Sequence, residues 1–127
     1  MAEGLMKLHV GSRIYVQSAG VASDREIDGF SIAVCEEVGV ELIRHKVRSF
    51  KELEEWGEDL HGYDLIVALS PAAESIAREN TFNAAVDVEF WDITDPTSIG
   101  ESREAKLIAF RDVRDDILNR IKARFPL

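Results

Sequence analysis

Cys35 is the only cysteine among the 127 residues, so it is the one thiol that a nucleophilic mechanism has available. A reactive cysteine needs neighbours that stabilise the thiolate and lower its pKa. Here Glu36 and Glu37 follow directly, and their negative charges favour the neutral thiol. The residue six places further on is Glu41 rather than an arginine. The pattern therefore indicates a structural cysteine inside a helix.

The three histidines lack the spacing of a metal site. His9, His45 and His61 lie far apart, and none has a second histidine or a cysteine at ligand spacing. Gly57, Gly62 and Gly100 are isolated turn glycines, and no glycine-rich loop is present to hold the phosphates of a nucleotide. We therefore expect no metal and no cofactor.

An apolar run in the middle of the chain organises the predicted fold. Residues 65–69 are five consecutive apolar side chains, a length that suits a strand buried on both faces. Ser70 is a good helix N-cap, and Pro71 suits the first helical position, where no backbone N–H is needed. A strand that passes directly into a helix is the unit of a parallel α/β sheet, whose functional groups gather at the carboxyl ends of the strands.

The remaining elements are predicted around this unit. Two further strands are expected, over residues 13–17 and, from strict alternation, over residues 86–90. Helices are expected over residues 1–9, 28–38, 49–56, 72–80 and 102–124. The sequence thus predicts an α/β fold with a parallel sheet of three strands flanked by helices, in a single domain over residues 1–127.

Several short motifs follow one another along the whole chain. They are Met1-Ala2-Glu3-Gly4-Leu5, Ser18-Ala19-Gly20, the stretch 39–45, the stretch 64–69 and Asp95-Pro96. Together they resemble the low-molecular-weight protein tyrosine phosphatase family, which also contains arsenate reductases. Each motif alone is weak, and their order and spacing make the resemblance specific. It implies the phosphotyrosine phosphatase I-like fold.

The resemblance also implies that the catalytic loop is missing. In that family a short central strand and a Cys-x5-Arg loop come immediately before the helix that here begins at Met1. The amides of this loop and the helix N-terminus hold the phosphate, and the low-pKa cysteine attacks phosphorus. Residues 1–127 contain no such loop. We therefore expect an N-terminally truncated domain, which lacks the first strand and both the catalytic cysteine and arginine.

Asp95 is the candidate site residue that the resemblance implies. Family members use the aspartate of this Asp-Pro pair as the general acid that protonates the leaving oxygen of the phosphate ester. The alternative interpretation is that Asp-Pro is a common turn dipeptide. Thr97 stands where many family members carry an aromatic side chain that lines the pocket, which leaves the substrate of a full-length form open.

Composition excludes several classes of partner. The net charge of −9 argues against nucleic acid and against an anionic membrane surface, because both need a basic face. No apolar run approaches the length of a membrane span, and the first twenty residues lack the pattern of a signal peptide. A single cysteine fits a reducing compartment. We therefore expect a cytoplasmic protein.

Three functions remain open from the sequence. The first is a phosphatase-like domain that is inactive as it stands, and the second is part of an active cysteine-dependent phosphotyrosine phosphatase or arsenate reductase with a mis-assigned start. The third is a non-catalytic interaction module. The partner that the resemblance implies for the full-length family is a phosphoprotein or an oxyanion.

The missing strand leads to an expectation about assembly. In the family's strand order it belongs between residues 13–18 and 64–70, in the middle of the sheet. Unpaired strand edges at that place need a partner. Either the two flanking strands close up and pair directly, or a second copy fills the gap. We expect a homodimer, with residues 13–17 or the first helix at the interface.

Overall fold

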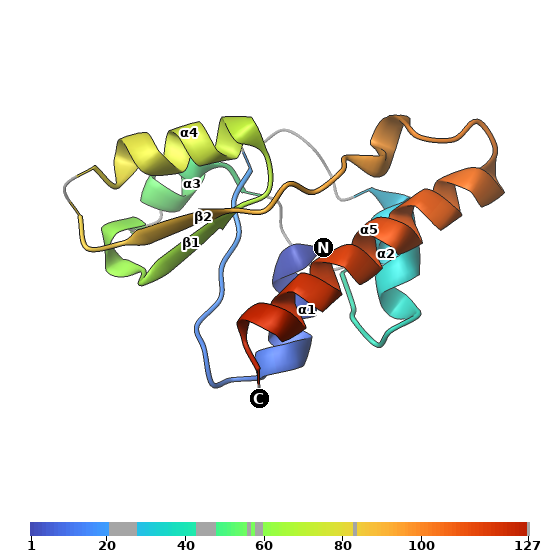
Figure 1. Cartoon of the computed structure of the whole chain (residues 1–127), viewed down its shortest axis with the longest axis horizontal. Helices are drawn as coiled ribbons and strands as arrows, with labels where there is room; N and C mark the ends of the chain where they lie inside the picture. The colour runs from blue at the N-terminus through green and yellow to red at the C-terminus, as the bar shows by residue number, and fades with distance from the viewer. Residues whose placement is uncertain (21–27, 43–47, 56, 58–59, 83, 127) are drawn as a thin grey trace. The chain divides into compact units, whose positions relative to one another are not determined.

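The computed structural model describes residues 1–20, 28–42, 48–55, 57, 60–82 and 84–126 (Figure 1). The chain divides into two compact units. Unit 1 comprises three separate segments, Met1–Ser18, Glu26–Lys46 and Thr94–Leu127. Unit 2 comprises Ala19–Arg25 and Val47–Ile93.

Unit 1 is helical. The long helix α5 packs against the other three elements of the unit, and α1 and α2 run beside it in Figure 1. Side chains from α1, α2 and α5, together with the segment that follows α2, form its apolar core. The elements are α1 (Ala2–Val10), α2 (Gly29–Glu36), the short 3-10 helix η2 (Pro96–Ser98) and α5 (Arg103–Arg124). The most buried core residues are Leu5, Val34, Cys35, Leu42, Phe110 and Ile121.

Local signals fix where these helices begin. Asp28 caps α2 by accepting a hydrogen bond from the Phe30 N–H at 2.8 Å, and Ser102 caps α5 by accepting from the Ala105 N–H at 3.1 Å. The Phe30 ring then stacks on Phe110 of α5, with ring centroids 5.5 Å apart. None of the helices that the structure describes is long and apolar enough to cross a bilayer.

Unit 2 contains the sheet. Strands β1 (Leu65–Ala68) and β2 (Asp87–Phe90) are parallel, with Leu65 opposite Asp87 and Ala68 opposite Phe90. Helix α4 (Pro71–Asn80) packs on both strands. The remaining elements are the helix α3 (Phe50–Glu55) and the 3-10 helix η1 (Leu60–Gly62).

The predicted strand-to-helix unit is confirmed. The apolar run forms β1, the hydroxyl of Ser70 accepts from the Ala73 N–H at 3.2 Å, and Pro71 is the first residue of α4. The strand expected over residues 86–90 is confirmed as β2, and the α/β fold with a parallel sheet flanked by helices is confirmed with it.

The strand predicted over residues 13–17 is wrong. These residues have no regular structure, and the side chains of residues 13–15 are exposed. The nearest pairing is an isolated parallel bridge between Gly20 and Ser49. A strand depends on a neighbour that accepts and donates its backbone hydrogen bonds, and the structure places no strand beside this segment in the part of the chain that it describes. The described sheet therefore has two strands rather than three.

Candidate functional site

Two of the sequence motifs meet at the start of α1. Glu3, in the first turn, has a side chain that is only 6% exposed. Its Oε1 accepts a hydrogen bond from the Ser18 hydroxyl at 2.9 Å, and its Oε2 forms an ion pair with Lys7 Nζ at 3.0 Å. A buried carboxylate needs such partners, and the helix N-terminus favours its negative charge. Glu3 therefore ties the Ser-Ala-Gly motif to the first helix.

Cys35 lies inside α2 and is fully buried, as expected of a structural cysteine. Burial raises the pKa of its thiol, because the thiolate loses its hydration, while the α-amino group of Met1 and the Arg114 guanidinium oppose this increase. Burial likewise lowers the pKa of the Met1 amino group, against the opposing charges of Cys35 and Glu3. The start of α1 and the C-terminal end of α2 thus share one buried electrostatic environment, in which the thiolate form of Cys35 is disfavoured.

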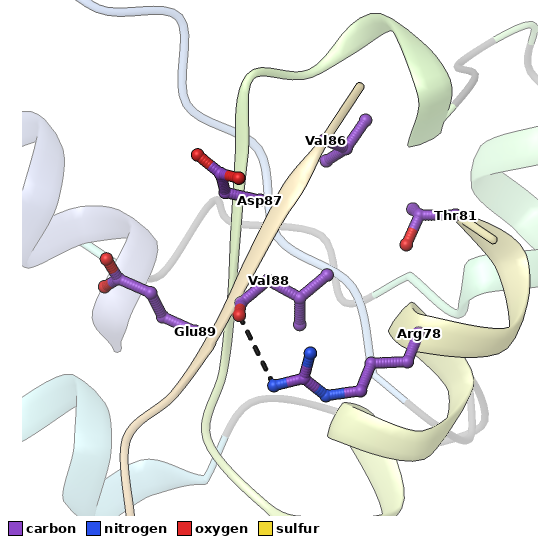
Figure 2. A pocket seen from close by; sticks show the side chains of 6 residues that line it. All are labelled: Arg78, Thr81, Val86, Asp87, Val88 and Glu89. Atoms are coloured by element: carbon purple, nitrogen blue, oxygen red, sulfur yellow. Dashed lines mark hydrogen bonds between the residues drawn. The ribbon is translucent and has the colours of Figure 1, made fainter. Parts of the chain in front are cut away.

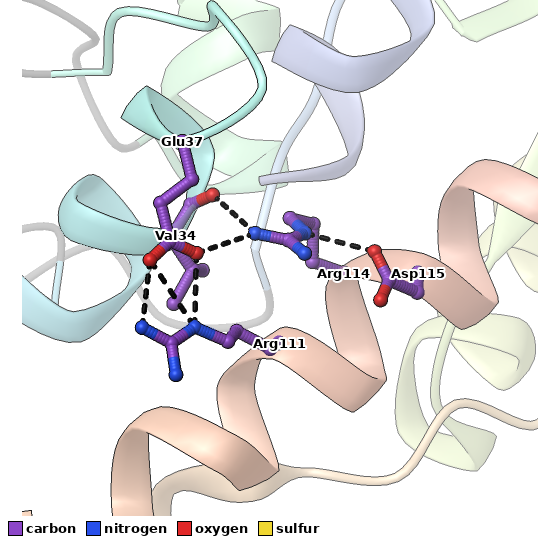
Figure 3. Close-up of polar contacts among 5 residues, drawn as sticks. All are labelled: Val34, Glu37, Arg111, Arg114 and Asp115. Carbon is purple, nitrogen blue, oxygen red and sulfur yellow. Dashed lines mark hydrogen bonds and ion pairs between the residues drawn. The ribbon is translucent and has the colours of Figure 1, made fainter. Parts of the chain in front are cut away.

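A cluster of charged side chains joins α2 to α5 (Figure 3). Glu37, at the end of α2, accepts hydrogen bonds from Arg111 Nε and Nη2 at 3.0 and 2.7 Å and from Arg114 Nη1 at 2.7 Å. Arg114 Nη1 also donates to the Val34 carbonyl at 2.8 Å, and its Nε donates to Asp115 at 2.9 Å. The hydrogen bonds from Arg111, followed by those from Arg114, lower the pKa of Glu37 to about 2.

This cluster was not predicted from the sequence, because its members lie 74 and 77 residues apart and no local pattern marks them. Both arginines already donate hydrogen bonds to acceptors of the protein itself, and these ion pairs raise the pKa of both guanidinium groups. The arrangement therefore fastens α2 to α5.

Asp95 is exposed and lies directly before η2. Its Oδ1 accepts hydrogen bonds from the Thr97 N–H at 3.0 Å and from the Thr97 hydroxyl at 2.7 Å. The residue thus has the geometry of a turn cap, with η2 packed against α5. An exposed carboxyl in this position can still exchange a proton with solvent or with a substrate. Its role as a general acid stays a prediction.

The histidines bind carbonyl oxygens at helix ends. His9 Nε2 donates to the Phe125 carbonyl and His61 Nε2 donates to the Asn80 carbonyl, each at 2.6 Å. His45 lies outside the described residues. Across the positions that the structure does describe, no three His, Cys, Asp or Glu side chains are grouped to hold a metal ion.

Unit 2 has an open recess of about 560 Å³ between α4 and β2 (Figure 2). Arg78 reaches across from α4 and donates from Nη2 to the Val88 carbonyl at 3.4 Å. This recess lies along the side of β2 rather than at the carboxyl ends of the strands, where the sequence predicts a site. Its lining residues are Arg78, Thr81, Val86, Asp87, Val88 and Glu89.

Comparison with known proteins gives consistent results. Residues 1–125 match the protein-family model described as low molecular weight phosphotyrosine protein phosphatase. An arsenate reductase from Halalkalibacterium halodurans is 28% identical over 122 residues, which are 96% of this chain and 82% of that relative. A solved structure described as an arsenate reductase in the reduced state superimposes with a TM-score of 0.72 at 25% identity, over 97% of this chain and 83% of that one.

A further solved structure, Vibrio vulnificus Wzb in complex with benzylphosphonate, has a TM-score of 0.68 at 20% identity. The superposition covers 96% of this chain and 87% of that one. At this level of identity the likeness concerns the fold alone.

Proposed function

The chain belongs to the low molecular weight phosphotyrosine protein phosphatase family, and from this premise we propose that residues 1–127 form a domain of this family that does not by itself hydrolyse phosphate esters. One observation carries the proposal. Cys35, the only thiol in these residues, is 0% exposed near the C-terminal end of α2. Burial also raises its pKa, so the thiolate that the reaction needs is disfavoured.

Among the residues that the structure describes, the other parts of a cysteine-dependent mechanism are also missing around Cys35. Attack on a phosphate ester needs donors that neutralise the oxygens on phosphorus and an acid that protonates the leaving oxygen. Six residues after Cys35 stands Glu41, whose charge would repel a phosphate. Arg114 contributes to the electrostatics of Cys35, but it is hydrogen-bonded to Glu37 and Val34. Of the machinery, only Asp95 has a counterpart here, as the proposed general acid.

An assay of the 127-residue chain tests this proposal. We expect no turnover of p-nitrophenyl phosphate above that of a Cys35→Ser variant, because the wild-type thiol never meets the substrate. Turnover that is present in the wild type and lost in Cys35→Ser would contradict the proposal. Loss of turnover in Asp95→Asn as well would then place both residues in one active site.

The second candidate is an active enzyme, a longer protein that carries a Cys-x5-Arg loop before Met1. The names of the relatives favour it, since they include arsenate reductases and tyrosine phosphatases. In that case the 127 residues are an N-terminally truncated form with a mis-assigned start. Reading the codons upstream of Met1 tests this, and an in-frame Cys-x5-Arg-Ser-Pro there is the result expected of the active enzyme.

The two chemistries of such an enzyme make different demands on thiols. Phosphate-ester hydrolysis needs one nucleophilic cysteine, whereas reduction of arsenate to arsenite takes two electrons, which thiols supply by forming a disulfide. Cys35 is buried and has no second cysteine within residues 1–127. Arsenate reduction by the longer form would therefore need a second thiol from outside residues 1–127. The discriminating assay compares turnover of a phosphotyrosine peptide with reduction of arsenate in the presence of an added thiol.

A third candidate is a non-catalytic interaction module of a cytoplasmic protein, without nucleic acid or membrane as partner. We also propose that the chain forms a homodimer. Besides residues 13–17 and α1, the outer edge of β1 is a candidate interface, because the described sheet leaves that edge without a neighbouring strand. The apolar sequence of Leu65–Ala68 places no like charges across a pairing of two such edges.

A further inference from the structure

The pairing of β2 with β1 defines which backbone groups of β2 form hydrogen bonds with β1. The N–H of Asp87 donates to the Asp64 carbonyl at 3.1 Å, and the N–H of Trp91 donates to the Ala68 carbonyl at 2.9 Å. Successive residues of a strand direct their backbone groups alternately to one neighbour and the other. The backbone groups of Asp87, Glu89 and Trp91 therefore face β1.

The backbone groups of Val86, Val88 and Phe90 consequently face the opposite way. We call them the outer edge of β2. No other strand pairs with this edge in the part of the chain that the structure describes. Such an edge presents a row of donors and acceptors that an added strand can bind.

Arg78 is the side chain that now occupies this edge. Figure 2 shows it extending from α4 to the Val88 carbonyl. The distance of 3.4 Å is beyond the usual range for such a bond, and the same Nη2 atom also contacts Glu74 Oε2 at 3.0 Å. The contact with Val88 is therefore weak, and Arg78 can release it while it keeps its ion pair with Glu74.

The side chains of β2 divide the edge into two faces. Val86 and Val88 point towards α4 and line the recess together with Thr81, whereas Asp87 and Glu89 point to the opposite face (Figure 2). Asp87 is exposed and Glu89 is partly exposed. An added strand would thus meet carboxylates on one face and a recess with valine side chains on the other.

The carboxylates argue against a second copy of this chain as the occupant. Antiparallel pairing of two outer edges about Val88 would place Asp87 of one copy opposite Glu89 of the other. Centring the pairing on Asp87 places Asp87 of one copy opposite Asp87 of the other, and centring it on Glu89 does the same for Glu89. Like charges directly across a sheet are unfavourable, so these three registers are opposed.

We propose that the outer edge of β2 binds an extended peptide segment of another protein, with lysine or arginine at alternate positions. The backbone of this segment pairs with Val86, Val88 and Phe90. Its basic side chains lie across from Asp87 and Glu89, and the apolar side chains between them enter the recess. The negative net charge of the chain favours the approach of the same partner.

Binding of short labelled peptides to the 127-residue chain tests this proposal. The probe is a fluorescein-labelled peptide of sequence Gly-Lys-Val-Lys-Val-Lys-Gly, and the matched control replaces its lysines by glutamates. Measured by fluorescence anisotropy at low salt, the lysine peptide is expected to bind on the order of tenfold more tightly than the control. Equal binding of the two peptides would overturn the proposal.

Charge reversal locates the site. The double variant Asp87→Lys/Glu89→Lys is expected to lose the lysine peptide and to prefer the glutamate peptide. The control variant Glu101→Lys/Asp112→Lys makes the same change of net charge at exposed positions of unit 1, and it should retain the original preference. Equal losses in both variants would show attraction to the whole molecule rather than to this edge.

A change in the peptide distinguishes strand addition from charge attraction without altering the protein. Methylation of alternate backbone nitrogens of the lysine peptide removes the donors that pair with the outer edge but keeps its charges. We expect this peptide to bind on the order of tenfold more weakly, because main-chain hydrogen bonds supply much of the affinity in strand addition. Unchanged binding would contradict pairing with β2.

Discussion

Glu37 and Arg114 form an ion pair with an N–O distance of 2.7 Å although 77 residues separate them in sequence. Arg114 is nearly buried, whereas Glu37 and Arg111 are about equally exposed, with side chains 39% and 40% exposed. The carboxylate thus pairs with one guanidinium that has lost most of its hydration and with a second that has not. This cluster is the polar fastening between α2 and α5.

Stability should depend on the ionisation of Glu37. Its pKa lies at about 2 in the folded chain, below the usual value of 4.5, so ionised Glu37 stabilises the folded state. This contribution is complete above about pH 4.5 and is lost as the pH falls towards 2. We therefore expect Glu37→Gln to lower the urea midpoint at pH 7, and the difference from wild type to shrink between pH 4.5 and pH 2.

The control for this prediction is Glu36→Gln. Glu36 is an exposed neighbour on the same helix. Its replacement should leave the urea midpoint close to that of the wild type at pH 7 and at lower pH. A pH-independent difference between Glu37→Gln and wild type would contradict the role assigned to the charge.

The thiol of Cys35 should be inaccessible in the folded chain. Because it is fully buried and its pKa is raised, a thiol reagent such as Ellman's reagent reacts with it only when the protein opens. We expect labelling at pH 8 to be slow without urea and to reach one thiol per chain once the protein is unfolded. Immediate labelling of the native protein would show that Cys35 is exposed and would reopen its candidacy as a nucleophile.

Gly4 is a position where α1 approaches the segment after α2 closely. A Cβ atom at this position would lie 2.7 Å from Val40 Cγ1 and 2.9 Å from Leu42 Cδ2. We expect Gly4→Ala to destabilise the fold by about 1–3 kcal/mol, because overpacking outweighs the helix propensity gained. Gly29→Ala is the matched control, since a Cβ atom there meets nothing within 4 Å. Urea denaturation of both variants measures the difference.

The two roles of Asp95 can be separated by two substitutions. Asp95→Ala removes the acceptor for Thr97 and should cost about 0.5–2 kcal/mol in unfolding free energy, as loss of a cap does. Asp95→Asn retains an acceptor oxygen but cannot donate the proton of a carboxylic acid. In a gene product that carries the Cys-x5-Arg loop, we expect Asp95→Asn to lower kcat by about 10²–10⁴-fold with little change in stability. Equal activity of Asp95→Asn and wild type would leave Asp95 with the capping role alone.

The proposed homodimer gives a direct prediction for sedimentation equilibrium. At micromolar concentration we expect twice the chain mass of 14.2 kDa. A stable monomer would contradict the dimer and would favour closure of the sheet within one chain. If the dimer is found, Val67→Lys tests where it pairs, because a charge at the outer edge of β1 should weaken a dimer that pairs there.

The accuracy of the sequence predictions follows the range of the interactions involved. Ser70 and Pro71 mark the start of α4, and the cap bond joins residues only three apart. The Asp116–Arg120 ion pair, at 2.9 Å, likewise joins residues four apart on one helix. Such features can be read from spacing. The five residues 13–17 carry an equally good local pattern, but a strand also needs a distant partner, and the local pattern does not say whether one is present.

The site was predicted less completely than the fold. The place of Cys35 inside a helix was predicted, and the structure adds that the residue is fully buried. Glu37 and Arg111 each look like one of many surface charges, and only the packing of α2 on α5 brings them together. The recess beside β2 likewise depends on how α4 crosses the strand, which the sequence of neither element reveals.

The division of unit 1 into three sequence segments has a consequence for folding during synthesis. Helices α1 and α2 leave the ribosome before unit 2 does, and α5, which packs on both, is synthesised after all the other described elements. Unit 2 is complete once residue 93 has emerged, so it can form while the apolar faces of α1 and α2 still await their partner. We therefore expect chaperones to bind the first two helices during synthesis. In chains that stop before Arg103, the same two helices should be the target of degradation.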